Sequence, residues 1–330
     1  MKNILILNSG TRDVLIRDFI NTAQGRCKIV VTDNYELAPA LYESPFHYVT
    51  KRWDEHGYWD EIETICKKED IGLVLSLIDP ELELLAMEKP RFDRLGILTN
   101  IAAPEAIKAT YDKYQTMEFL RREGFHCIPS YNDFNSVASD LAKGIISFPL
   151  ISKPRKGSGS ARIEIVSSLK RLKELCDLHD DLIIQEFIDG QEIGADVYVD
   201  LISGDVVSIF TKKKLKMRAG ETDKSVSFLD SKLFALLSDF SVRFGLKGTN
   251  DIDVFEKNGV YYISEVNPRF GGGYIHAYAC GVDFPSYLIN NMNGIPNKPE
   301  IGSYKSDLYM MKYFDITIAE KISCNSFRIL

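Results

Sequence analysis

Hydrophobic residues follow two spacings over the first hundred positions. Buried-strand patterns, short and almost continuously apolar, cover residues 3–8, 27–32 and 71–78. Between them, apolar residues recur at helical spacing near 15–20 and 58–69. This alternation predicts a parallel, doubly wound sheet with helices on both faces, in a domain that we place at residues 1–100. Ligands of such sheets bind beyond the carboxyl ends of the strands.

A hairpin pattern lies between residues 248 and 273. Two alternating, strand-like runs flank Lys257, Asn258 and Gly259, and Asn-Gly in that position is a strong signal for a tight turn. Strict alternation divides the second strand into two faces, with Tyr261, Ile263 and Glu265 on one and Tyr262, Ser264 and Val266 on the other. We therefore expect a regular two-stranded ribbon here.

Oxygen-bearing side chains gather on one face of this expected hairpin. Glu265 and Asn267 lie two residues apart and point the same way, and Asp253 reaches that face from the first strand. Two carboxylates and an amide oxygen are ligands that suit Mg2+ or Mn2+. Arg269 adds a fixed positive charge, and we expect the glycines at 271–273 to let backbone approach a ligand. The alternative is an edge hairpin with solvated charges.

A second group of residues is suited to phosphate. An apolar strand delivers Lys153 to a Gly/Ser loop, and an antiparallel strand follows at 163–166. The predicted phosphate-binding residues of this loop are Gly157, Ser158, Gly159 and Ser160. Lys113 opens a helix that Asp112 caps; a cation gains nothing from the dipole there, so we expect it to face an anion. A merely flexible loop and a solvated lysine are the alternatives.

A third pattern is an apolar strand from residue 182 that stops near Glu186 and resumes after Gly190. This favours a hinge between two lobes that binds adenine by its backbone, at Gln185, Glu186, Phe187 and Ile188. Strand alternation lets only one of Gln185 and Glu186 face the exocyclic amine. Glu192 is expected at the ribose hydroxyls. The alternative is the charged end of an ordinary hairpin.

The only strong basic run covers residues 211–222. We interpret it as a mobile loop in which Lys214, Arg218 or Gly220 closes on a triphosphate. Among these, Arg218 is our chosen phosphate contact. A solvated charged face and a nucleic-acid surface are the alternatives.

Composition narrows the class of protein. The chain has 330 residues and a formal charge of −7, which disfavours a nucleic-acid partner. Its six cysteines form no Cys-x-x-Cys pair, so free thiols in a reducing cytoplasm are expected. We find no apolar run of the about 18 residues that a membrane span needs, and no signal peptide at the N-terminus. We therefore expect a cytoplasmic protein without a membrane partner.

The string from Glu265 to Gly273 resembles the metal-binding strand of the ATP-grasp superfamily, and its flanks resemble the carbamoyl-phosphate synthase large subunit. The resemblance implies an α/β and α+β chain: a Rossmann-like pre-ATP-grasp domain (1–100), a first lobe with the Gly/Ser lid (101–185), and a second lobe with the metal site and C-terminal segment (186–330). The chain is too short for the two ATP-grasp halves of that large subunit.

The resemblance also implies a reaction. ATP-grasp enzymes are carboxylate–amine ligases that use ATP and Mg2+, pass through an acyl phosphate, and release ADP and phosphate. Lys113 and Lys153 then neutralise phosphates, and Arg269 and Lys153 are the predicted catalytic residues. An ATP-binding regulatory or assembly subunit is the alternative, and a dehydrogenase is weak without a glycine fingerprint. Small-molecule carboxylates and amines are the expected partners, and a homodimer is compatible with the sequence.

Overall fold

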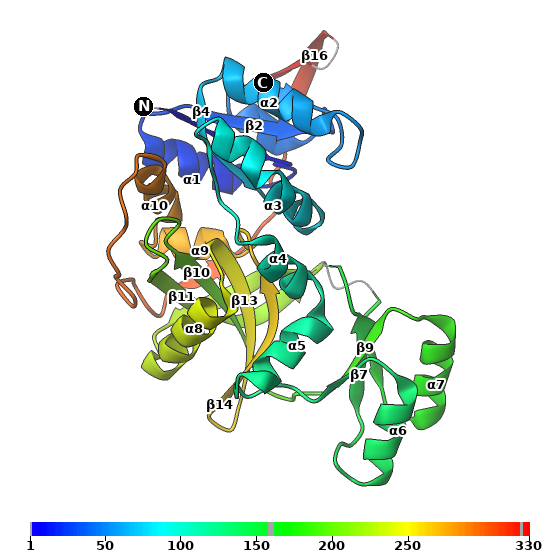
Figure 1. Ribbon diagram of the computed structural model, residues 1–330. Helices are drawn as coiled ribbons and strands as arrows, with labels where there is room; N and C mark the ends of the chain where they lie inside the picture. The colour runs from blue at the N-terminus through cyan, green and yellow to red at the C-terminus, as the bar shows by residue number, and fades with distance from the viewer. Residues whose placement is uncertain (1, 158–161, 324–325) are drawn as a thin grey trace.

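The N-terminal domain is the parallel sheet that the sequence predicts. The computed structural model describes residues 2–157, 162–323 and 326–330. Five parallel strands lie in the order β3-β2-β1-β4-β5, and their apolar side chains are buried because helices cover the sheet (Figure 1). The elements are β1 (Asn3–Leu7), α1 (Asp13–Ala23), β2 (Ile29–Asp33), the 3-10 helix η1 (Pro39–Glu43), β3 (His47–Val49), α2 (Tyr58–Lys68), β4 (Ile71–Ser76), α3 (Asp79–Arg94) and β5 (Leu98–Thr99).

A small lobe projects from the rest of the molecule (Figure 1). Its four strands form an antiparallel sheet in the order β6-β9-β7-β8, with a separate hydrophobic core around Val137, Leu150 and Leu172. The elements are β6 (Ser130–Tyr131), α6 (Phe134–Ala142), β7 (Leu150–Pro154), β8 (Glu164–Val166), α7 (Leu169–Leu178) and β9 (Leu182–Glu186).

A six-stranded antiparallel sheet forms the large lobe, in the order β14-β13-β10-β11-β12-β15. Helix α8 begins at the Asp230 cap and buries its apolar face against this sheet. The elements are β10 (Gln191–Val199), β11 (Val206–Arg218), β12 (Glu221–Phe228), α8 (Ser231–Phe244), β13 (Gly248–Lys257), β14 (Val260–Asn267), α9 (Tyr274–Ala279), α10 (Phe284–Met292) and β15 (Tyr309–Met311), followed by a separate hairpin of β16 (Ala319–Ser323) and β17 (Ser326–Ile329).

Packing joins the large lobe to its neighbours. Phe19 of α1 meets Phe270 edge-on, with ring centroids 5.5 Å apart, inside one core that also contains Tyr274 and Phe284. Helix α4 (Pro104–Tyr111) packs against the large sheet through Ala106 and Ala109, and α5 (Lys113–Arg122) through Met117 and Leu120, although the sequence grouped both helices with the small lobe. The small lobe, in contrast, has a hydrophobic core of its own.

Within the described ranges, we find no helix that combines the length and the apolar character needed to cross a membrane.

Candidate active site

A cavity of about 880 Å3 opens where the three parts of the molecule meet. The large sheet forms its floor, the small lobe and the start of α5 form one wall, and two loops of the N-terminal domain form the other end. The predicted residues that line it are Lys113, Lys153, Gly157, Gln185, Glu186, Phe187, Ile188, Glu192, Asp253, Glu265, Asn267 and Arg269. The fold thus brings together side chains that lie far apart in the sequence.

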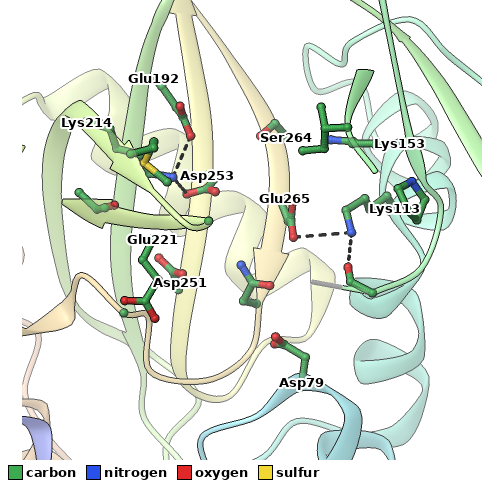
Figure 2. Close-up of a pocket in the computed structure, with 18 of the residues that line it drawn as sticks. Asp79, Lys113, Lys153, Glu192, Lys214, Glu221, Asp251, Asp253, Ser264 and Glu265 are labelled. Atoms are coloured by element: carbon green, nitrogen blue, oxygen red, sulfur yellow. Dashed lines mark hydrogen bonds and ion pairs between the residues drawn. The ribbon is translucent and has the colours of Figure 1, made fainter. Parts of the chain in front are cut away.

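The hairpin of β13 and β14 supplies the carboxylates of the floor. Asp253 pairs with Glu265 and Asp251 pairs with Asn267 across the two strands, so all four side chains share one face. Figure 2 shows Glu265 facing Lys113 across the cavity. Asp251 is a floor residue that the sequence analysis did not select.

A β-bulge corrects the predicted faces of β14. The pairing shifts between Asp253 and Val254, so the partner residues step from Glu265 to Ile263 and Ser264 has no partner of its own. Ile263 therefore packs into the core together with Val266, whereas Ser264 lines the cavity beside Glu265. The expected grouping of Ile263 with Glu265 was wrong because strict alternation contains no such extra residue.

Asp253 is held by a buried lysine. Lys214 places its Nζ 2.7 Å from Asp253 Oδ1 and 2.9 Å from Glu192 Oε1. That Asp253 oxygen is buried and has no hydrogen bond of good geometry among the described residues. Burial, with a contribution from Glu265, raises the pKa of Asp253, and Lys214 opposes that rise. The neighbouring carboxylates raise the pKa of Lys214 despite its burial, so this lysine stays charged.

The donor set of the floor fits a hard divalent cation. Asp253 and Glu265 offer carboxylate oxygens and Asn267 offers an amide oxygen, all on one face of the hairpin. Among the described residues, no three His, Cys, Asp or Glu side chains are gathered closely enough to form a cation site by themselves. A Mg2+ held here therefore needs oxygens from a ligand in addition, which is how protein-bound Mg2+ usually completes its shell.

Two lysines face this floor. Asp112 caps α5 by accepting from the N–H groups of Tyr114 and Gln115, and this fixes Lys113 in the first helical turn. The Nζ atom of Lys113 donates to Gly157 O and lies 3.6 Å from Glu265 Oε1. Lys153, on β7, has neither a hydrogen bond nor an ion pair through its ammonium in the described chain. Burial and the charge of Lys113 lower the pKa of Lys153, although Glu265 opposes this.

The predicted Gly/Ser lid is described only in part. Gly157 lines the cavity with a positive φ of 103°, a backbone conformation that favours glycine. Ser158, Gly159 and Ser160 lie outside the described residues.

One hydrogen bond bears on the hinge choice that the sequence left open. The Gln185 side chain is buried, and its amide nitrogen donates to Ser130 Oγ at 2.8 Å. The N–H groups of Glu186 and Phe187 donate to the carbonyls of Pro129 and Pro149. For the N–H of Ile188 we find no backbone partner in the part of the chain that the structure describes. Ile188 is thus the hinge donor with capacity for a ligand.

The basic run is a strand and not a loop, which corrects the sequence interpretation. Strand β11 continues to Arg218 and turns directly into β12. Alternation places Lys212 and Lys214 on the inner face, where Lys212 forms a buried ion pair with Asp196. Arg218 does not line the cavity; it pairs with Asp223 and stacks on Phe314. Strand pairing and ion pairs account for the charges that the sequence had suggested as a mobile loop closing on a triphosphate.

Two arginines close the end of the cavity at the N-terminal domain. Arg269 makes a two-point ion pair with Asp79, at 2.8 Å from each nitrogen, and also donates to Phe270 O. Burial alone would lower the pKa of Arg269, but Asp79 and Asp251 more than reverse this. Arg12, from the loop after β1, lies 3.2 Å from Glu221 of β12. Neither Arg12 nor Glu221 was selected from the sequence.

The three glycines after Arg269 make room for charged side chains. A Cβ added to Gly271 would lie 2.5 Å from Asp251 Cγ, one on Gly272 would lie 2.6 Å from an Arg12 nitrogen, and one on Gly273 would lie 2.8 Å from Lys212 Cε. From the sequence, these glycines were expected to let backbone approach a ligand. The structure shows that they first admit the side chains of the site itself.

Comparison with known proteins agrees with this architecture. One family model, for a PylC-like N-terminal domain, matches residues 4–100, and another, for an ATP-grasp domain, matches residues 110–273. A parallel N-terminal domain followed by two lobes around one cavity is the arrangement of that class. The chain is an ATP-grasp protein that resembles carbamoyl-phosphate synthase, as the motif at 265–273 predicted.

Its relatives are distant. A carbamoyl-phosphate synthase of Methanobrevibacter smithii is 28% identical over 257 residues, which cover 71% of this chain and 67% of the relative. An uncharacterised protein of Methanocaldococcus jannaschii is 28% identical over 174 residues, covering 52% of this chain and 43% of that protein. The match thus leaves a third or more of each relative outside it.

Solved structures share the fold. The biotin carboxylase domain dimer of Hydrogenobacter thermophilus 2-oxoglutarate carboxylase, in complex with MgADP, ADP and bicarbonate, has a TM-score of 0.75 at 14% identity, covering 94% of this chain and 73% of that one. The N5-carboxyaminoimidazole synthetase of Staphylococcus aureus, complexed with ADP, has a TM-score of 0.71 at 17% identity, covering 93% and 81%. At such identities the likeness establishes the fold alone.

Proposed function

We propose that the protein is an ATP-dependent ligase that joins a small carboxylate to an amine or a related nucleophile. The observation that supports this proposal is that two facing walls of one cavity carry opposite charges. Oxygen ligands from Asp253, Glu265 and Asn267 lie on the large sheet, and the cations of Lys113 and Lys153 face them from the other side. A metal–triphosphate carries charges that complement both walls at once.

The nucleotide is proposed to lie along the hinge. Ile188 N–H is the backbone donor for the adenine edge, and Glu186 supplies the polar group beside it, because the Gln185 amide is bound to Ser130. Glu192 is placed for the ribose hydroxyls, although Lys214 already contacts one of its oxygens. Binding of the nucleotide would therefore share Glu192 with Lys214, since a carboxylate can accept several hydrogen bonds.

The phosphates are proposed to lie between the lysines and the sheet floor. Lys153 has no partner for its ammonium among the described residues, and Lys113 is fixed near Gly157 and Glu265. A Mg2+ held by Asp253, Glu265 and Asn267 would neutralise charge on the β- and γ-phosphates. The MgADP in the 2-oxoglutarate carboxylase domain supports this cofactor choice for the shared fold.

The proposed chemistry needs little from protein side chains beyond position and charge. An oxygen of the substrate carboxylate attacks the γ-phosphorus, the bond from that phosphorus to the bridging oxygen breaks, and ADP leaves. The amine then attacks the acyl carbon of the acyl phosphate, and phosphate leaves. Arg269, held rigidly by Asp79, is proposed to stabilise the charge that develops on the transferred group.

A product assay tests this function. The protein is incubated with Mg-ATP and pools of amino acids, dipeptides and small carboxylates, and the nucleotide products are separated. We expect one pool to accelerate release of ADP and phosphate, and hydroxylamine in place of the amine to yield a hydroxamate. AMP and pyrophosphate as products would exclude the acyl-phosphate route. Binding of Mg-ATP without turnover in any pool would favour a regulatory or assembly subunit.

A further inference from the structure

Arg12 is the least satisfied guanidinium of the cavity. Its side chain is about one-quarter exposed (24%), and its one close partner is Glu221, with 3.2 Å between Nη2 and Oε1. No hydrogen bond from this guanidinium is found within the described residues, whereas Arg269 donates one to Asp79 Oδ2 and one to Phe270 O, and its Nε also lies 2.8 Å from Asp79 Oδ1. A guanidinium has five N–H donors, so Arg12 keeps most of its capacity. Arg12 is one of the residues that line the cavity.

The surroundings of Arg12 are built closely around it. A Cβ on Gly272 would come within 2.6 Å of an Arg12 nitrogen and 2.7 Å of Glu221 Cδ, so a larger residue there would have to displace the ends of this pair. Burial lowers the pKa of Arg12, and the charge of Arg269 adds to this, while Glu221 and Asp251 oppose it. A desolvated cation with unused donors is stabilised when an anion binds to it.

Carboxylates surround the same space. Glu221 keeps one oxygen near Arg12 and holds Lys312 with the other at 2.9 Å. Asp251 also lines the cavity, 3.9 Å from an Arg269 nitrogen, and its carboxylate makes no hydrogen bond among the residues described. Figure 2 draws both acids on the cavity floor. This end thus offers one available guanidinium beside two carboxylates that can each accept further hydrogen bonds.

We propose that this end of the cavity binds an amino acid, with its carboxylate on Arg12 and its ammonium group between Glu221 and Asp251. The planar fork of a guanidinium matches a carboxylate in two-point contact. A phosphate dianion is disfavoured, because Glu221, Asp251 and Asp79 would repel its second charge. Arg12 is then a specificity-determining residue supplied by the N-terminal domain. This inference rests on the proposed ligase function, since it names one of the two substrates.

The first test is substrate choice. The twenty common L-amino acids are supplied singly with Mg-ATP and a pool of small carboxylates, and ADP release is measured. The amino acid with the largest effect is then compared with the amine that lacks its carboxylate and with the acid that lacks its amine. We expect both truncated compounds to be much poorer substrates, because each leaves a charged group of the site unpaired.

The second test is the variant Arg12→Gln, with Arg12→Lys as a conservative partner. We expect Arg12→Gln to raise KM for the amino acid about 10- to 100-fold, with KM for ATP unchanged. Wild type should discriminate strongly between the amino acid and its decarboxylated amine, and Arg12→Gln should lose that discrimination. Arg12→Lys should restore part of it. The control is Arg17→Gln, an exposed arginine of α1 outside the cavity.

Three outcomes would overturn the inference. One is Mg-ATP binding and turnover with no dependence on any amino acid, which leaves the ligase function in place. Another is Arg12→Gln lowering kcat for every substrate while the discrimination against the amine persists, because that pattern belongs to a structural salt bridge. The last is a wild-type melting temperature that Mg-ATP does not change, because this result would contradict the proposed ligase function and therefore also the inference that rests on it.

Discussion

The two walls of the cavity carry opposite charges, and they hold those charges differently. On the large sheet, carboxylates are matched by lysines of β11: Asp253 of β13 by Lys214 at 2.7 Å, across the intervening strand β10, and Asp196 of β10 by Lys212. On the opposite wall, the ammonium of Lys153 has no partner within the described chain, and Lys113 is 3.6 Å from Glu265. The sheet is therefore organised before a ligand binds, whereas the small lobe offers a cation that a ligand must satisfy.

This difference follows from topology. Residues of adjacent antiparallel strands face each other at fixed spacing, so opposite charges on β10, β11 and β13 pair without any ligand. The small lobe has its own core and meets the sheet mainly across the cavity. A metal–triphosphate would complete both walls, because the metal takes the carboxylate oxygens and the phosphates take the lysines.

The largest effect is expected from Glu265→Gln, which removes one carboxylate from the organised wall. Turnover should fall by more than about 100-fold, since loss of even an outer-shell partner of a metal site costs 10- to 100-fold. The fold should persist because Glu265 is partly exposed and Gln preserves its volume. Steady-state ADP release and a melting curve measure the two effects.

The matched control is Glu256→Gln at the far end of the same hairpin. Glu256 accepts the Gly259 N–H in the turn, and a glutamine oxygen can keep that bond. It should retain wild-type turnover. If Glu265→Gln turned over at the wild-type rate, the metal assignment would be wrong.

The second effect concerns Lys214→Met and stability. This change leaves Asp253 and Glu192 without their cation. Breaking the ion pair in this way is expected to lower the free energy of unfolding by roughly 2 to 4 kcal/mol. The loss is smaller than for a fully buried pair because the Glu192 side chain is about one-third exposed (32%). Mg2+ alone should restore stability in the variant more than in the wild type, since it replaces positive charge beside Asp253. Urea unfolding with and without Mg2+ measures this, and an equal response of the two proteins would count against a metal at Asp253.

The sequence predicted the local parts of this site well. The hairpin, the Asp112 cap with Lys113 and the strand that carries Lys153 all depend on residues close together in the chain, where turn, cap and alternation signals operate. Arg12, Asp251 and Glu221 were missed because their neighbours come from other domains and strands. The bulge at Ser264 and the pairing of the basic run depend on how the strands align in the sheet. The alternation of residues along one strand does not reveal that alignment.

A smaller effect is expected from Lys153→Met. Loss of a charge-assisted phosphate contact should weaken ATP binding about tenfold. Calorimetric titration measures it, with Lys170→Met as a control from the exposed side of α7 in the same lobe. Equal affinities in wild type and Lys153→Met would remove this lysine from the phosphate site.

The lowered pKa of Lys153 predicts that both the stability of the protein and its affinity for ATP depend on pH. Burial lowers the pKa of Lys153 in the folded protein, so between that lowered pKa and the ordinary value near 10.4 the unfolded chain binds more protons. Stability from this group should therefore rise with pH across that window, while ATP affinity falls because phosphate prefers the charged lysine. Lys153→Met should flatten both trends. A variant whose ATP affinity kept the wild-type pH profile would show that another group titrates.

The smallest effect is expected from Arg218→Gln. Arg218 is 43% exposed, pairs with Asp223 and lies outside the cavity, so its loss should change ATP affinity and turnover by less than about twofold. Titration of Mg-ATP against this variant checks the point. A marked loss of affinity would mean that the hairpin of β11 and β12 moves onto the phosphates when ATP binds.

Transfer of oxygen from the substrate carboxylate to phosphate tests the central claim most directly. The carboxylate found in the pool assay is labelled with 18O, turned over with unlabelled Mg-ATP and amine, and the released phosphate is analysed by mass spectrometry. Attack of the carboxylate on the γ-phosphate predicts one labelled oxygen in each phosphate molecule, with ADP as the other product. Phosphate without label, formed at the rate of product, would contradict an acyl-phosphate ligase.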